Sequence, residues 1–131
     1  MLSTIKTSRE NKEIVSQLTR RLNLGAENII ARIALSYSIS KERKMDLKLA
    51  KDSGGKEYSP KVLFGDYLEY YIALVCVHYN LPKNNHEVAR YIKMHIDDGL
   101  SLINNEIENN PNITGSEFLI SKIERGVKAF H

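Results

Sequence analysis

The chain has 131 residues, of which 42% are hydrophobic, and a formal net charge of +3 at pH 7. This length and composition predict a single globular domain, residues 1–131, rather than a disordered chain. No run of eighteen apolar residues occurs and the N-terminus lacks an apolar signal region, so we expect a cytoplasmic protein without a membrane partner. The single cysteine, Cys76, excludes an internal disulfide.

The charge is unevenly distributed along the chain. Residues 1–61 carry 13 Lys and Arg against 7 Asp and Glu, whereas residues 62–131 carry 6 against 9. This asymmetry predicts an anionic partner for the first half of the chain. The alternative is a charged face that only contacts solvent.

Residues 1–40 have the pattern of a short strand followed by two helices, a ribbon-helix-helix-like element. Residues 2–8 favour an extended backbone, and residues 9–24 and 27–39 have helical hydrophobic periodicity. Ser8 is the expected N-cap of the first helix, and Gly25 its left-handed stop. One strand forms no sheet alone, so we expect a second copy to pair with it in a dimer or tetramer. Paired strands backed by helices can enter a DNA groove.

Residues 41–61 are predicted to form a basic loop region, and residues 62–131 a helical remainder with about three further helices. The helix that opens at Gly65-Asp66, with Asp66 as its cap, is the most apolar, and we expect it to be central. A helix over about 85–107 contains Gly99, which predicts a kink or close packing. A capping box at Thr114 begins the last helix. Its apolar positions are Phe118, Ile120, Ile123, Val127 and Phe130. The predicted fold class is therefore mainly α.

The sequence offers little that could perform catalysis. It contains no nucleotide-binding loop and no zinc-protease motif. Cys76 and the nearby histidines, including His95, lack metal-ligand spacing, so we expect a buried thiol and partly exposed histidines. Asp97 and Asp98 suggest a metal-dependent nuclease, but adjacent helical residues diverge by about 100°, which favours two surface acids. We therefore expect no enzyme, no cofactor and no metal site.

DNA binding is the better-supported prediction. With Ile5 facing inward, strand alternation places Thr4 and Lys6 on the opposite face, where they can reach a groove. Asn28 and Arg32 lie at the start of the second helix, where free N–H groups can bind phosphate, although Glu27 would compete. Cations from the first half would neutralise further phosphates and make the affinity steeply salt-dependent. The predicted DNA-binding residues are Thr4, Lys6, Arg9, Asn28, Arg32, Lys41, Arg43, Lys44 and Lys48.

Three sequence blocks resemble the DNA sulfur modification (phosphorothioation) family DndE. They are Leu24-Gly25 with 28–36, Leu63-Phe64-Gly65-Asp66-Tyr67 with 71–74, and His95-Ile96-Asp97-Asp98-Gly99-Leu100. The resemblance spans roughly residues 10–105, with the order and spacing of the blocks kept. The chain departs from the family pattern at Ala26-Glu27, where a hydroxyl cap and a proline are usual, and in its tail after Asn109.

The resemblance implies a small, mainly helical, oligomeric and non-catalytic subunit that associates with duplex or nicked DNA. In such systems an iron–sulfur subunit, DndC, transfers sulfur and DndD is an ATPase, so DndC-like and DndD-like partners are implied. Two alternatives stay open. One is a ribbon-helix-helix transcriptional regulator, and the other is an assembly subunit with little DNA contact.

Overall fold

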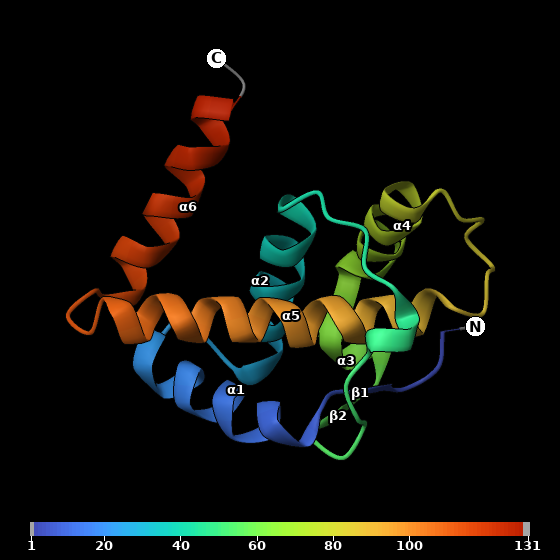
Figure 1. Ribbon diagram of the computed structural model, residues 1–131, viewed down its shortest axis with the longest axis horizontal. Helices are drawn as coiled ribbons and strands as arrows, with labels where there is room; N and C mark the ends of the chain where they lie inside the picture. The colour runs from blue at the N-terminus through green and yellow to red at the C-terminus, as the bar shows by residue number, and fades with distance from the viewer. Residues whose placement is uncertain (1, 130–131) are drawn as a thin grey trace.

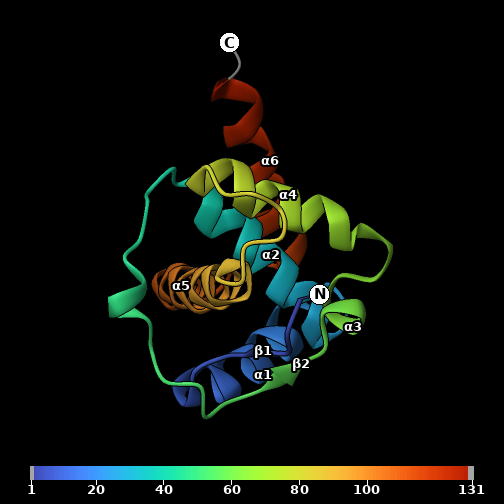
Figure 2. The same cartoon turned by 90° about the vertical axis from the view of Figure 1, so that its right-hand side faces the viewer.

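The computed structural model describes residues 2–129 of the chain, with side chains as far as Arg125. The expected apolar positions Val127 and Phe130 of the last helix lie outside these described side chains. Helix α5 (Val88–Asn109) is the longest element and forms the axis of the molecule (Figure 1). Helix α1 (Arg9–Leu22) runs along one side of α5, and α4 (Leu68–Tyr79) lies on the other (Figure 2). Helix α6 (Gly115–Ala129) projects from the end of α5.

Helix α2 (Glu27–Ser40) crosses α5 at close range. A Cβ atom at Gly99 would lie 1.9 Å from the carbonyl oxygen of Ala34, so only glycine permits this backbone approach. The close packing predicted at Gly99 is confirmed, and α5 remains one continuous helix there. The crossing buries Ile30, Leu35 and Ile103 in the centre of the core.

The N-terminal strand pairs within its own chain. Strand β1 (Ile5–Lys6) is antiparallel to β2 (Glu57–Tyr58), with Ile5 opposite Tyr58 and Lys6 opposite Glu57. The expectation that β1 must pair with a second copy was wrong, because β2 supplies its hydrogen-bonding partner. The dimer or tetramer therefore stays a prediction, and strand pairing is no longer a reason to expect it.

Local signals set several helix ends. Ser8 caps α1 as predicted, since its side chain accepts the N–H of Asn11. The left-handed residue after α1 is Asn23, with φ of 52°, and not Gly25 as expected. Thr114 caps α6 as the capping box predicted, since its hydroxyl accepts the N–H of Glu117.

The segment before α4 differs from the prediction. A short helix, α3 (Pro60–Phe64), and a 3-10 turn, η2 (Gly65–Tyr67), precede α4, so Asp66 does not cap it. Ser59 caps α3, and Pro60 suits its first turn. The expectation that this apolar helix is central was also wrong. Its outer residues Tyr70 and Val77 are exposed, whereas the longer α5 spans the domain and contacts α1, α2 and α4.

None of the described helices combines the length and the apolar composition that crossing a membrane requires.

Candidate nucleic-acid interface

The predicted DNA-binding residues lie in three places. The first is β1 and the start of α1, where Thr4, Lys6 and Arg9 are exposed; for Thr4 and Lys6 the alternation around buried Ile5 predicted this. The Lys6 ammonium lies 3.7 Å from the Glu57 carboxylate across the strand pair. Both side chains are largely exposed, so this ion pair contributes little and leaves Lys6 accessible to another anion.

The second place is the beginning of α2, where Asn28 and Arg32 contact the chain around α3. The Asn28 amide donates to the carbonyl of Val62 at 3.3 Å, and the Arg32 Nε donates to the carbonyl of Leu63 at 2.5 Å. These bonds position α3 against α2. The Glu27 carboxylate, which was expected to compete with phosphate here, pairs with the Lys56 ammonium at 3.1 Å.

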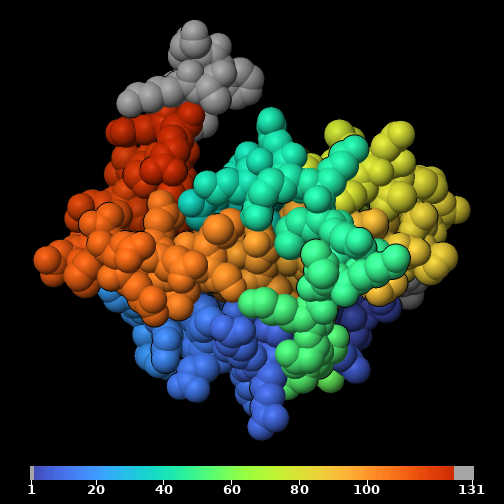
Figure 3. Space-filling view, in the orientation of Figure 1, coloured from blue at the N-terminus to red at the C-terminus, as the bar shows by residue number. Residues whose placement is uncertain are grey.

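The third place is residues 41–50, here named the basic segment. It leaves the end of α2, includes the short 3-10 helix η1 (Leu47–Leu49), and crosses the surface of α5 (Figure 3). Lys41, Lys44 and Lys48 are exposed, and within the described residues none of the three forms an ion pair. This segment therefore presents the most available positive charge among the predicted residues.

Arg43 anchors the basic segment to α5. Its guanidinium lies 2.5 Å from the Asp98 carboxylate, whose other partner at 2.6 Å is the Ser38 hydroxyl. The backbone carbonyl of Arg43 is 2.7 Å from the His78 ring, which adds a contact with α4. The backbone N–H of Met45 donates to the Tyr79 hydroxyl at 3.1 Å. Arg43 is thus tied to its own chain, unlike the neighbouring lysines.

These anchors meet at a buried histidine. His95 has one ring nitrogen 2.7 Å from the Ser38 hydroxyl and the other 2.5 Å from the Tyr79 hydroxyl. Ser38 donates its only proton to Asp98, so it must accept from Nδ1–H of His95, and Nε2 then accepts from Tyr79. Burial, and secondarily His78, lowers the pKa of His95 to about 4, which keeps the ring neutral as this pattern requires.

The sequence-based expectation of partly exposed histidines was wrong for His95, which is fully buried. The hydroxyls of Ser38 on α2 and Tyr79 on α4 contact its ring, and the Asp98 carboxylate on α5 accepts the proton of the Ser38 hydroxyl. The only local signal is that His95 and Asp98 stand three residues apart, on one face of α5.

Asp97 was also misassigned as a surface acid. It is 2% exposed, and its Oδ1 accepts the N–H of Ser8 at 3.0 Å and the Asn11 amide at 2.7 Å. Its Oδ2 lies 2.5 Å from the ammonium of Lys93, four residues earlier on α5. Asp97 and Asp98 contact different neighbours, as their divergence on the helix predicted. Within the described residues, no three His, Cys, Asp or Glu side chains group as metal ligands would.

Residues 4–110 match the protein family described as DNA sulphur modification protein DndE. The chain belongs to the DndE family. The resemblance noted in the three sequence blocks is confirmed, and the match extends it to β1. A search of curated proteins returns no match.

Solved DndE structures share the fold. The crystal structure of DndE from Escherichia coli B7A, described as involved in DNA phosphorothioation modification, is 19% identical with a TM-score of 0.64. A glycine-to-lysine double mutant of DndE, described as involved in DNA phosphorothioation, is 20% identical with the same TM-score. Each comparison covers 79% of this chain and 99% of the other. The family match ends before α6, which agrees with the departure expected after Asn109.

Proposed function

We propose that this DndE-family chain is a non-catalytic, DNA-binding subunit of a DNA phosphorothioation system. It binds duplex or nicked DNA through its basic surface and assists DndC-like and DndD-like subunits, which carry out sulfur transfer and ATP hydrolysis. The observation that carries the proposal is the basic segment. It presents exposed, unpaired lysines on a surface whose backbone is fixed by Arg43, Tyr79 and His78.

Fixing the backbone matters for phosphate binding. A mobile loop would lose conformational entropy on binding, whereas a segment already tied to α4 and α5 loses less. Lys44 and Lys48 are four residues apart and can contact neighbouring phosphates without breaking internal ion pairs. Contacts of this kind position DNA and carry no base specificity.

Two alternatives make different demands. A ribbon-helix-helix regulator needs a ribbon made from two copies, and the pairing of β1 with β2 argues against it. An assembly subunit with little DNA contact would not depend on the exposed lysines. DNA binding by variants of the basic segment therefore separates the proposal from this second alternative.

The test is fluorescence anisotropy with intact, nicked and single-stranded DNA, at KCl concentrations from roughly 50 to 300 mM. The double variant Lys44→Gln/Lys48→Gln should bind more weakly and reduce the salt slope by roughly two. The charge-matched control Arg20→Gln/Lys83→Gln removes two exposed cations elsewhere and should keep the wild-type slope. Equal slopes for both variants would show that the basic segment only contacts solvent.

The non-catalytic part of the proposal has its own assay. The purified chain should not nick supercoiled plasmid with magnesium, manganese or zinc, and its effect should appear only when partner subunits are reconstituted with it. Metal-dependent nicking that Asp98→Ala abolishes, in a variant that still folds, would overturn this part.

A further inference from the structure

A groove of 770 Å³ lies between α2, the start of α4 and α6. The wall that α2 supplies is one straight stripe of residues at spacings of three and four, which includes Ile29, Ile33, Ser36 and Ser40. The lining positions of α2 run from Ile29 to Lys41, a rise of roughly 18 Å, which is about three turns of a helix. The groove is therefore long enough to receive a helix.

The middle of the groove leaves room for an incoming helix. Ser36 and Ser40 are exposed and their side chains are small, so a second helix can approach the backbone of α2 there. Apolar side chains lie beside them, namely Ile29 and Ile33 on α2 and Ile123 on α6. Ile123 is 59% exposed, so water contacts much of its apolar surface. An occupant with apolar side chains would remove this surface from water.

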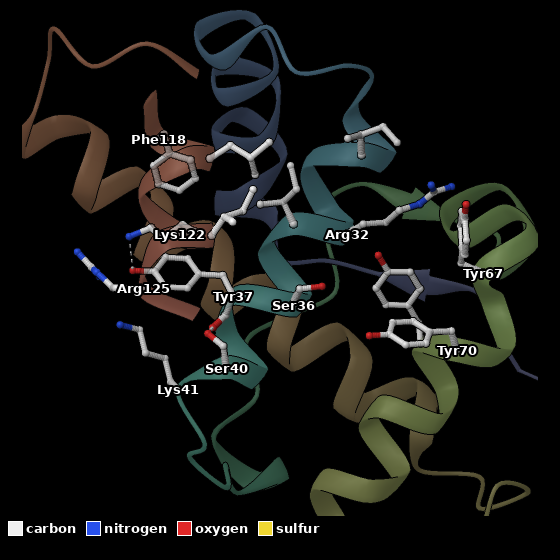
Figure 4. A pocket seen from close by; sticks show the side chains of 15 residues that line it. Arg32, Ser36, Tyr37, Ser40, Lys41, Tyr67, Tyr70, Phe118, Lys122 and Arg125 are labelled. Atoms are coloured by element: carbon white, nitrogen blue, oxygen red, sulfur yellow. Dashed lines mark hydrogen bonds between the residues drawn. The ribbon is translucent and has the colours of Figure 1, made fainter. Parts of the chain in front are cut away.

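Positive charge stands at both ends of the groove. Arg32 lies at one end, beside Tyr67 (Figure 4). Lys41 and Arg125 lie at the other end, with Ser36 between the two ends. Among the described residues no carboxylate lines the groove, and none of these three cations forms an ion pair. An occupant with carboxylates near both of its ends would complement the groove.

The polar groups where α2 meets α6 already have partners inside the chain. The Lys122 ammonium pairs with the Glu106 carboxylate, and the Tyr37 hydroxyl donates to the same carboxylate at 3.1 Å. These groups need no hydrogen bond from an occupant. The positive charge that an occupant must satisfy is therefore confined to the ends of the groove.

We propose that this groove receives an acidic amphipathic helix from a partner protein of different sequence. The apolar side chains of that helix recur at spacings of three and four residues and pack on the floor of the groove. Its carboxylates meet Arg32 at one end and Lys41 and Arg125 at the other. The inference rests on the partner role within the proposed function, gives that role a surface, and does not depend on DNA contact.

Two other occupants fit the groove less well. Helix α6 of a second copy exposes, on the face turned away from the groove, a single isoleucine, Ile120, between Glu117 and Glu124. One apolar side chain is too few for a groove of three turns, since a docked helix uses an anchor in each turn. Duplex DNA has a phosphate backbone on its outside and no apolar side chains to bury on the floor.

The probe is a fluorescein-labelled helical peptide of roughly four turns, with leucines at spacings of three and four residues and glutamates near both ends. Fluorescence anisotropy with the full chain should show binding that weakens as KCl rises, because salt screens the exposed charges. One control peptide has the same composition in scrambled order, so it lacks the apolar face. The other has lysine in place of every glutamate. Both controls should bind at least roughly tenfold more weakly.

A substitution in the middle of the groove tests the position of the peptide. Ser36→Glu places a carboxylate there and should weaken binding of the glutamate peptide by roughly tenfold or more. The matched control is Ala73→Glu, at a small exposed residue of α4 that does not line the groove, and it should bind the peptide as the wild type does. Circular dichroism verifies that both variants fold.

Charge exchange tests the ends of the groove. Lys41→Glu/Arg125→Glu should lose affinity for the glutamate peptide and gain affinity for the lysine peptide, which a misfolded chain could not do. Lys12→Glu/Arg20→Glu makes the same change of charge at exposed residues of α1 that do not line the groove. This control should leave the preference between the two peptides unchanged.

Three results would overturn the inference. One is no binding of the glutamate peptide at roughly 100 µM of the wild-type chain. Another is an equal loss of peptide binding in Ser36→Glu and Ala73→Glu. The third is unchanged peptide binding by Ser36→Glu together with a lower sedimentation mass of the chain alone or weaker DNA binding, which would assign the groove to a second copy or to DNA.

The variant Lys44→Gln/Lys48→Gln separates this inference from the proposed DNA binding. It should bind DNA more weakly and still bind the glutamate peptide, whereas Ser36→Glu should do the reverse. Failure of partner docking and failure of DNA binding are therefore distinguishable.

Discussion

Replacing Asp97 with alanine should destabilise the fold more than replacing any exposed acid. Its carboxylate accepts the N–H of Ser8 and the Asn11 amide, and it neutralises the Lys93 ammonium at 2.5 Å. Lys93 is only 8% exposed, so the variant leaves a buried cation without its counter-ion. Breaking a buried ion pair from one side costs about 3–5 kcal/mol, and two further donors lose their acceptor. We expect a loss of about 4 kcal/mol or more, out of a typical total of about 5–15 kcal/mol.

The measurement is urea unfolding followed by circular dichroism. The control Asp66→Ala removes an exposed carboxylate and should change stability by less than about 0.5 kcal/mol. Adding Lys93→Met to Asp97→Ala should restore part of the loss, because the unpaired ammonium is then gone. A loss below about 1 kcal/mol for Asp97→Ala, or no recovery in the double variant, would refute the reasoning.

Three other predictions concern single buried positions. Gly99→Ala should lower stability by about 2 kcal/mol or more in urea unfolding, because the new Cβ meets the backbone of Ala34, and an unchanged midpoint would contradict the close crossing. The pKa of His95 is lowered from 6.5 to about 4 in the folded protein, so as pH falls this histidine is protonated in the unfolded chain before it is protonated in the folded one. Stability should therefore drop by up to about 1.4 kcal/mol per pH unit between those values, and His95→Gln should show a flatter profile. Cys76 is buried and its thiol pKa is raised by that burial, so a thiol reagent should label it slowly in the native protein and rapidly in urea.

Local signals in the sequence determined much of the helical framework. Hydrophobic periodicity located α1 and α2, and a single side-chain oxygen at Ser8 or Thr114 was enough to place the start of a helix. These features depend on residues within one or two helical turns, so they can be predicted from the sequence without knowledge of the tertiary structure. The glycine at position 99 also predicted a close approach, although the sequence did not identify α2 as the neighbour.

The tertiary structure alone decided which distant groups meet. Ile5 of strand β1 pairs with Tyr58, 53 residues later, so the second copy inferred from the sequence is not needed for pairing. Arg43 and Lys44 are adjacent exposed cations, yet Arg43 is paired with Asp98, whereas Lys44 forms no ion pair with the described residues. Burial of a charged or titratable side chain depends on donors and acceptors supplied by other elements. For that reason the sequence determined where most helices of this protein form. Only the packing of α5 against the other elements decided which polar residues are buried and hold the fold, and which stay exposed.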